Sequence, residues 1–167
     1  MKAQAILERR FSFILNGRQV SVSSPPAHTL LEVLRERLEV TGPKEDCAKG
    51  ECGACTVLMN GRPVLSCLVL MSQAEGAEIV TSEGFMKDGL PDYIQKAFID
   101  NGAVQCGHCI PGFIVSTEAL LSRNPNPSSE DVKMALAGNL CRCTGYTSII
   151  GAVKDAAHRK TQEPSKS

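Results

Sequence analysis

Eight cysteines carry the chemistry that this sequence of 167 residues can perform: Cys47, Cys52, Cys55, Cys67, Cys106, Cys109, Cys141 and Cys143. The first three are spaced C-x4-C-x2-C and a fourth follows, a spacing at which four thiolates hold a 2Fe-2S cluster. Gly50 and Gly53 lie within this stretch, and glycine permits the sharp bends and the close backbone approach that a cluster loop needs. The spacing therefore predicts one iron-sulfur site in the first half of the chain.

The other four cysteines form two close pairs, in the segments QCGHC at 105–109 and CRC at 141–143. Two antiparallel helices joined by the Asn-Pro-Asn-Pro turn at 124–127 would bring these pairs together. Each pair would then precede a helix N-terminus, whose free N–H groups and positive dipole lower a thiol pKa and stabilise an anionic cluster. The sequence therefore predicts a second four-cysteine site with lowered thiol pKa values.

A histidine, His108, stands between Cys106 and Cys109 and raises the alternative of Rieske ligation. That ligation replaces two cysteines by two histidines. Eight cysteines already fill two sites, and no second histidine follows the later cysteine pair. We interpret His108 as a loop or interface residue that tunes the site through hydrogen bonding.

The composition is that of a globular protein, with 43% hydrophobic residues, 22% charged residues and a net charge of zero. A neutral chain without a basic patch does not predict a nucleic-acid partner. The charged N-terminus lacks a secretory apolar run, and no later segment is apolar enough to span a membrane. We expect a cytoplasmic protein in a reducing compartment, where metal ligation is favoured over disulfide scaffolding.

The patterning predicts an α+β unit at 1–83 and an all-α unit at 84–167. Asn16-Gly17 and Asn60-Gly61 are hairpin signals between alternating strands, and Thr29 with Glu32 makes a capping box. The expected elements of the first unit are strands within 10–23, a helix from about 30 that stops at Gly42-Pro43, and strands at 56–59, 64–67 and 77–81.

Apolar residues recur at helical spacing from about residue 91 and imply four helices. Pro111 suits a first helical turn, Ser128 with Asp131 resembles a capping pair, and the polar tail at 159–167 is expected to be frayed. Each unit has roughly 80 residues, a size at which a structural metal is often recruited. Apoprotein is therefore expected to be poorly folded.

The order of the motifs C-x4-C-x2-C-x11-C, QCGHCIPGF and GNLCRCTGY resembles the iron-sulfur small subunit of the molybdenum hydroxylases, the xanthine dehydrogenase and aldehyde oxidase family. The resemblance extends from Asn16 to about Val153. It implies an N-terminal β-grasp domain like plant ferredoxins, followed by a four-helix bundle with a second 2Fe-2S cluster. It also implies a large molybdenum-pterin subunit and a medium FAD subunit as partners, in a heterotrimer or its dimer.

The resemblance further implies residue roles. The cysteines from Cys47 to Cys67 would bind the cluster nearer the flavin, and those from Cys106 to Cys143 would bind the cluster nearer molybdenum. Gln105 matches a glutamine that hydrogen-bonds the molybdopterin, and Cys143 matches the ligand next to that cofactor.

No phosphate-binding glycine loop, activated nucleophile or carboxylate pair stands out in the sequence, so the chain is not expected to be catalytic alone. The predicted function is single-electron transfer from the molybdenum centre through two 2Fe-2S clusters to FAD or another acceptor. The alternatives are a free-standing 2Fe-2S carrier or sensor, a zinc protein with two all-cysteine sites and a disulfide scaffold. The substrate pocket would belong to the large subunit.

Overall fold

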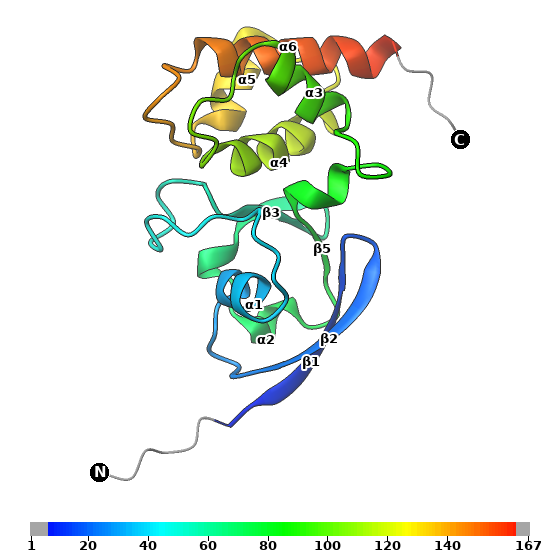
Figure 1. Ribbon diagram of the computed structural model, residues 1–167, viewed down its shortest axis with the longest axis vertical. Helices are drawn as coiled ribbons and strands as arrows, with labels where there is room; N and C mark the ends of the chain where they lie inside the picture. The colour runs from blue at the N-terminus through cyan, green and yellow to red at the C-terminus, as the bar shows by residue number, and fades with distance from the viewer. Residues whose placement is uncertain (1–6, 163–167) are drawn as a thin grey trace.

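The computed structural model describes residues 7–162 and places a helical half above a half built on a sheet (Figure 1). The sheet has five strands in the order β2-β1-β5-β3-β4. Its strands are β1 (Arg9–Leu15), β2 (Arg18–Ser24), β3 (Thr56–Met59), β4 (Arg62–Leu65) and β5 (Glu78–Val80). β1 and β5 are parallel, and the other neighbours are antiparallel. The mixed α and β architecture that the sequence predicts is confirmed.

Both hairpins turn at the predicted Asn-Gly pairs. Asn16 and Gly17 have φ values of 50° and 77°, and Asn60 and Gly61 have 51° and 74°. A type I′ turn requires positive φ at both central residues, which asparagine and glycine tolerate best. These two turns fix the register of β1 against β2 and of β3 against β4.

The helix α1 (Leu30–Glu36) packs its apolar side on the sheet, after the capping box of Thr29 and Glu32. The predicted stop at Gly42-Pro43 is wrong, because the helix ends at Glu36 and Glu39 already has a left-handed φ of 56°. The sequence analysis also missed α2 (Met71–Ala74), a single turn too short to show a helical period. The core between sheet and helices contains Phe11, Phe13, Leu30, Leu34, Met71 and Ile79.

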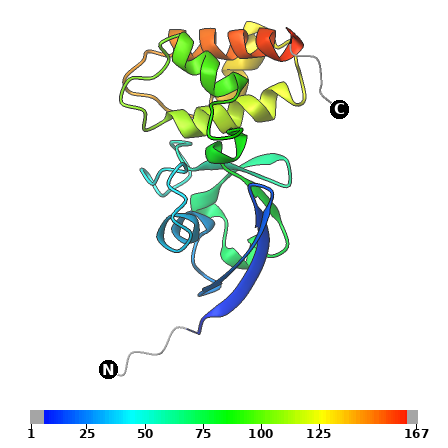
Figure 2. The ribbon, with the colours of Figure 1, turned by 45° about the vertical axis from the view of Figure 1, so that its right-hand side comes forward.

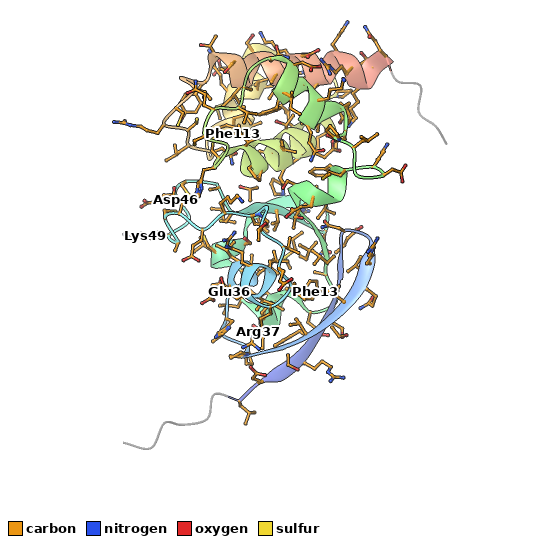
Figure 3. The ribbon with its side chains drawn as sticks, viewed as in Figure 1. Phe13, Glu36, Arg37, Asp46, Lys49 and Phe113 are labelled. Carbon is orange, nitrogen blue, oxygen red and sulfur yellow. The ribbon has the colours of Figure 1, made fainter. Side chains whose placement is uncertain are left out.

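The second half contains α3 (Tyr93–Asp100), α4 (Ile110–Leu121), α5 (Ser129–Leu136) and α6 (Thr147–Gln162). α3 contacts α4 and α6, and α5 contacts the same two helices. Phe98, Phe113 and Ile149 are fully buried, and Phe113 is labelled among the helices in Figure 3. The expected fraying from Arg159 is wrong for 159–162, which complete α6, and the rest of that tail lies outside the described residues.

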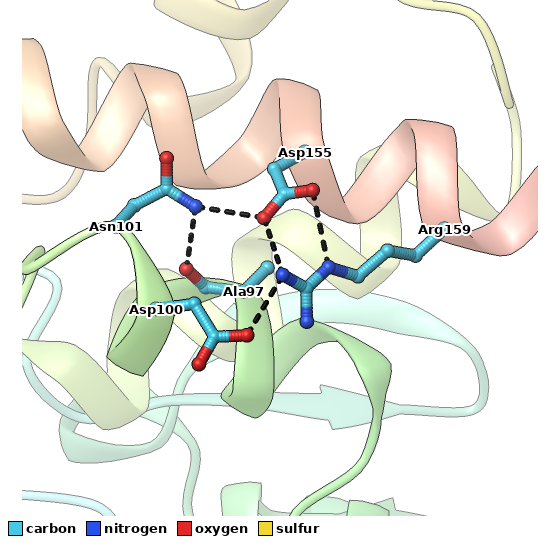
Figure 4. Close-up of polar contacts among 5 residues, drawn as sticks. All are labelled: Ala97, Asp100, Asn101, Asp155 and Arg159. Carbon is cyan, nitrogen blue, oxygen red and sulfur yellow. Dashed lines mark hydrogen bonds and ion pairs between the residues drawn. The ribbon is translucent and has the colours of Figure 1, made fainter.

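A polar network on the outer side of α3 and α6 holds the two helices together (Figure 4). Arg159 donates from Nε and Nη2 to the two carboxylate oxygens of Asp155, and Nη2 also donates to Asp100 at 2.8 Å. Asn101 donates to Asp155 at 2.7 Å and to the Ala97 carbonyl at 2.9 Å. The network joins the C-terminal end of α3 to α6.

The two halves meet where α4 lies across β3, which both ribbon views show (Figures 1 and 2). Leu58 of β3 and Val115 and Ala119 of α4 are buried against one another in a small apolar cluster. Among the helices of residues 7–162, none has both the length and the apolarity needed to cross a bilayer.

Candidate metal centres

The first candidate centre lies on the loop that joins α1 to β3, whose outer edge carries the exposed side chains of Asp46 and Lys49 (Figure 3). Three backbone N–H groups, those of Lys49, Glu51 and Cys52, point at the Sγ atom of Cys47, each at 3.4 Å. They stabilise the thiolate and lower the pKa of Cys47 to about 6. The loop thus favours the anionic form of this sulfur, which is the form that ligates a metal.

The four cysteines of this centre are grouped in two pairs. The Cys52 thiol lies close enough to Cys47 to act on its pKa, and the Cys55 thiol acts in the same way on Cys67. Burial raises the pKa of Cys67 to about 11, with a further contribution from the neighbouring Cys55. The charge of Cys47 also acts on Cys67, so the two pairs belong to one site. Cys52, Cys55 and Cys67 are buried, and Cys47 is half-buried.

The loop wraps tightly because of a glycine with a left-handed backbone. Gly50 has a φ of +82°, and a Cβ there would meet the side chain of Leu68 at 2.5 Å. A larger residue would therefore be strained by its backbone and would also displace Leu68 from its place beside Cys67. Gly50, one of the two glycines predicted to shape this loop, therefore lies at a position that requires glycine.

The second candidate centre is also made of two pairs. The Sγ atoms of Cys106 and Cys143 lie 3.5 Å apart, and the thiols of Cys109 and Cys141 each act on the pKa of the other. Cys106 and Cys143 are exposed, whereas Cys109 is buried at the N-cap of α4 and Cys141 is half-buried. The centre therefore has an outer pair at the surface and an inner pair toward the core.

Hydrogen bonds to the inner pair come from the TGY segment after Cys143. The Thr144 N–H and hydroxyl donate to the Sγ atom of Cys141 at 3.4 and 3.2 Å. Burial opposes ionisation of Cys141, yet these donors lower its pKa overall. The Cys141 N–H donates in turn to the Tyr146 hydroxyl at 2.9 Å, and the Tyr146 ring makes an edge contact with Phe113.

The expectation that helix N-termini lower the thiol pKa values here is wrong for Cys109. Its pKa is raised to about 12, because burial and the adjacent Cys141 outweigh the hydrogen bond from the backbone. Cys143 also has a raised pKa, owing to its hydrogen bond with Cys106. A positively charged metal centre would reverse both effects, because it deprotonates a coordinating thiol outright.

The arrangement of the eight cysteines can be compared with the ligands that a 2Fe-2S cluster needs. Within residues 7–162, no three His, Cys, Asp or Glu side chains are grouped as the ligands of a single ion. Grouping in pairs fits a centre with two metal atoms, each taking two thiolates. All eight cysteines have free thiols, and N–H groups reach one sulfur in each site. The residues therefore fit two 2Fe-2S clusters.

The remaining predicted site residues lie beside the outer pair. Gln105 and His108 are exposed and flank Cys106 in the loop between α3 and α4. Sequence reasoning missed Thr144 and Tyr146, although both are within five residues of Cys141 and carry hydroxyl groups. It also missed Asn139, whose contacts span more than 80 residues and leave no local signal.

Comparisons with known proteins identify both halves as iron-sulfur domains. Residues 18–90 match the model of a 2Fe-2S iron-sulfur cluster binding domain. Residues 81–154 match the model of a [2Fe-2S] binding domain. Each matched segment contains four of the eight cysteines.

Curated relatives cover most of the chain. The nicotinate dehydrogenase small FeS subunit of Eubacterium barkeri is 49% identical over 145 residues, which are 87% of this chain and 92% of the relative. The xanthine dehydrogenase iron-sulfur-binding subunit of Escherichia coli O157:H7 is 44% identical over 148 residues, 87% of this chain and 92% of the relative.

Solved structures share the fold. Quinoline 2-oxidoreductase from Pseudomonas putida 86 contains a chain that superposes with a TM-score of 0.89 at 38% identity, over 93% of this chain and 97% of that chain. The aldehyde oxidoreductase of Desulfovibrio desulfuricans superposes with a TM-score of 0.89 at 43% identity, but this chain spans only 18% of it. The same two-part fold thus occurs both as a separate chain and within a longer one.

Proposed function

Because this chain belongs to the family of iron-sulfur subunits of the molybdenum hydroxylases, we propose that its two four-cysteine sites each hold one 2Fe-2S cluster in a multisubunit oxidoreductase. When bound, the clusters supply one-electron redox chemistry, so that a two-electron oxidation is passed on in single steps. The chain is the electron-transfer subunit of such an enzyme. The division of the eight cysteines into two groups of four, each within one matched iron-sulfur domain, is the observation that carries the ligand assignment.

Each sulfur pair would hold one iron atom. Cys47 with Cys52 and Cys55 with Cys67 would hold the two irons of the first cluster. The outer pair, Cys106 with Cys143, and the inner pair, Cys109 with Cys141, would hold those of the second cluster. The N–H groups that point at Cys47 and Cys141 would stabilise the negative charge that a cluster gains on reduction.

The exposure of the second site supports its assignment as the one nearer molybdenum. Gln105, Cys106 and Cys143 form an open patch at which a pterin could reach both the glutamine amide and a ligand sulfur. We propose that Gln105 hydrogen-bonds the molybdopterin of a large partner subunit and that Cys143 lies next to it. The first site, with Cys47 half-buried beside exposed loop residues, would face a medium subunit with FAD.

The partner set and domain plan complete the proposal. We propose a heterotrimer or its dimer in the cytoplasm, with a substrate set by the large subunit, since the relatives are named for nicotinate and xanthine. The boundary would lie between 83 and 84, within the turn of 3-10 helix at Ser82–Phe85. The sheet with α1 across it supports a β-grasp domain, and the ring of contacts among α3 to α6 supports a four-helix bundle.

The test is iron analysis and electron paramagnetic resonance of the full chain, copurified with its partners and reduced with dithionite. Two 2Fe-2S clusters predict about four irons per chain and two distinguishable signals. Cys47→Ser should remove only one signal, and Cys106→Ser should remove only the other. Each variant thus serves as the matched control for the other site.

Three outcomes would contradict the proposal. A colourless protein with zinc would indicate structural metal sites. A single signal that both variants abolish would mean that the sulfurs are not divided as assigned. A coloured protein that never copurifies with large subunits would indicate a free-standing carrier.

A further inference from the structure

One buried side chain, Asn139, links the two cysteine sites directly. It is 5% exposed, and it lies two residues before Cys141. Its Nδ2 donates to the carbonyl of Gly53 at 3.0 Å, and Gly53 lies between Cys52 and Cys55. A single amide therefore joins the loop of the first site to the segment that carries the second.

The oxygen of the Asn139 amide is hydrogen-bonded as well as the nitrogen. Its Oδ1 accepts a hydrogen bond of 2.7 Å from the Ser116 hydroxyl on α4, the helix that Cys109 caps. The Gly53 carbonyl also accepts from the N–H and hydroxyl of Thr56 at 3.2 and 2.6 Å. Ser116 and Thr56 are themselves buried, so the network is sealed from water. A buried polar network whose members are all satisfied specifies one arrangement.

The backbones of the two halves are in direct contact around Asn139, at positions where a side chain would not fit. Gly53 has a φ of +72°, and a Cβ there would overlap the Gly138 carbonyl and lie 2.6 Å from the Asn139 amide. A Cβ at Gly112 would overlap the Gly53 carbonyl in the same way. The next residue, Leu140, donates its N–H to the carbonyl of Cys52 at 2.8 Å. Cys52 and Cys141 are thus separated by one hydrogen bond and the backbone of Leu140.

The apolar part of the interface does not impose this register. Leu58, Val115 and Ala119 make a small apolar cluster, and nonpolar contact is not directional. Hydrogen bonds are directional, so a shift of α4 along β3 would break the bonds of Asn139 and of the Leu140 N–H. The Asn139 amide and the Leu140 N–H therefore select one relative position of the two cysteine sites, and of the two only the amide belongs to a side chain.

We infer that Asn139 is a positioning residue that fixes the separation and orientation of the two cluster sites, and so the passage of electrons between them. The inference rests on the proposed function, because it concerns two filled sites. Coupling between two redox centres weakens steeply with distance, as does the magnetic interaction between them when both are reduced. That interaction is a readout that does not require turnover.

The test compares Asn139→Asp with Asn126→Asp in the full chain with its partners. Asn139→Asp keeps size and the acceptor for Ser116 but replaces the donor that faces the Gly53 carbonyl with a second acceptor. Asn126 is exposed in the turn before α5 and provides the same chemical change away from the interface. Iron content, the two separate signals and the splitting caused by their mutual interaction are measured on reduced protein.

The expected result is that Asn139→Asp retains both signals and full iron content but loses or changes the splitting, whereas Asn126→Asp matches wild type. Unchanged splitting in iron-loaded Asn139→Asp would overturn the inference, even if the variant were less stable. If Asn139→Asp does not fold, Asn139→Ala decides the question. That variant removes both hydrogen bonds of the amide without adding a charge, and unchanged splitting in it would overturn the inference. Wild type without two signals would instead refute the proposed function.

Discussion

Replacing Gly53 by alanine should destabilise the protein far more than the same change at Gly61. The two glycines have nearly the same backbone conformation, with φ values of +72° and +74°. They differ in surroundings, because a Cβ at Gly61 would meet nothing within 4 Å, whereas one at Gly53 would overlap the Gly138 carbonyl. The pair therefore separates backbone strain from close approach.

The magnitudes follow from these two costs. A left-handed conformation costs an alanine about 1–2 kcal/mol, and the stiffer unfolded chain returns about 0.4–1 kcal/mol. Gly61→Ala should therefore lose about 1 kcal/mol. Gly53→Ala should lose about 1–3 kcal/mol more, since the overlapping carbonyl is backbone and cannot rotate away.

The assay is thermal unfolding of the iron-loaded chain at one scan rate, followed by far-ultraviolet circular dichroism and by the visible absorption of the clusters. With about 2–4 °C per kcal/mol in a chain of this size, Gly61→Ala should lower the midpoint by about 2–4 °C and Gly53→Ala by about 4–16 °C. Equal midpoints for the two variants would refute the close packing of the two cysteine loops.

Tyr146→Phe removes the hydroxyl that accepts from the Cys141 N–H but keeps the ring, so a redox titration should show a shifted potential for the second site and an unchanged one for the first. Ser128→Ala removes the N-cap of α5 and should lower the free energy of unfolding by about 1 kcal/mol in denaturant titrations, with iron content unchanged. Burial raises the pKa of Asp92, with Glu118 adding to it, so the ionised form costs stability above that pKa. Asp92→Asn, which caps α3 equally well, should stabilise the protein at pH 7, and the gain should shrink as the pH falls and Asp92 takes up its proton. Removal of iron with a chelator should make the chain sensitive to proteases within the two cysteine loops, and resistance equal to that of the loaded protein would contradict a structural role for the metal.

Local features of this fold could be predicted from the sequence because their causes are local. The Asn16-Gly17 turn, the Thr29 capping box and the first-turn Pro111 depend on a few adjacent residues, and the structure places each as expected. The end of α1 at Glu36 was misjudged, since no breaker marks it and the left-handed Glu39 is favoured only by the surrounding fold. α2 is too short for any periodicity.

In the candidate sites, too, the sequence predicts the features with local causes and misses those that depend on packing. Cysteine spacing predicts the two groups of four sulfurs, but it does not predict how deeply each sulfur is buried. The rise in the Cys109 pKa therefore went against the argument from the helix dipole, which considered only the helix and not its packing. The bond from Asn139 to Gly53 joins residues from opposite halves, and only the packed structure shows that they meet.

The distribution of exposure over the eight sulfurs fits the proposed passage of electrons between partner subunits. The second site exposes Cys106 and Cys143 on one side and turns Cys109 and Cys141 inward, toward the Leu140 N–H that bonds the Cys52 carbonyl. The first site receives that contact at buried Cys52, and its more accessible sulfur, Cys47, lies on the outer loop. A path through the chain therefore begins and ends at accessible sulfurs and is sealed from water where the two sites meet. This contact contains glycine backbones, the Asn139 amide and the Leu140 N–H, so a change in its geometry would alter the separation of the two sites.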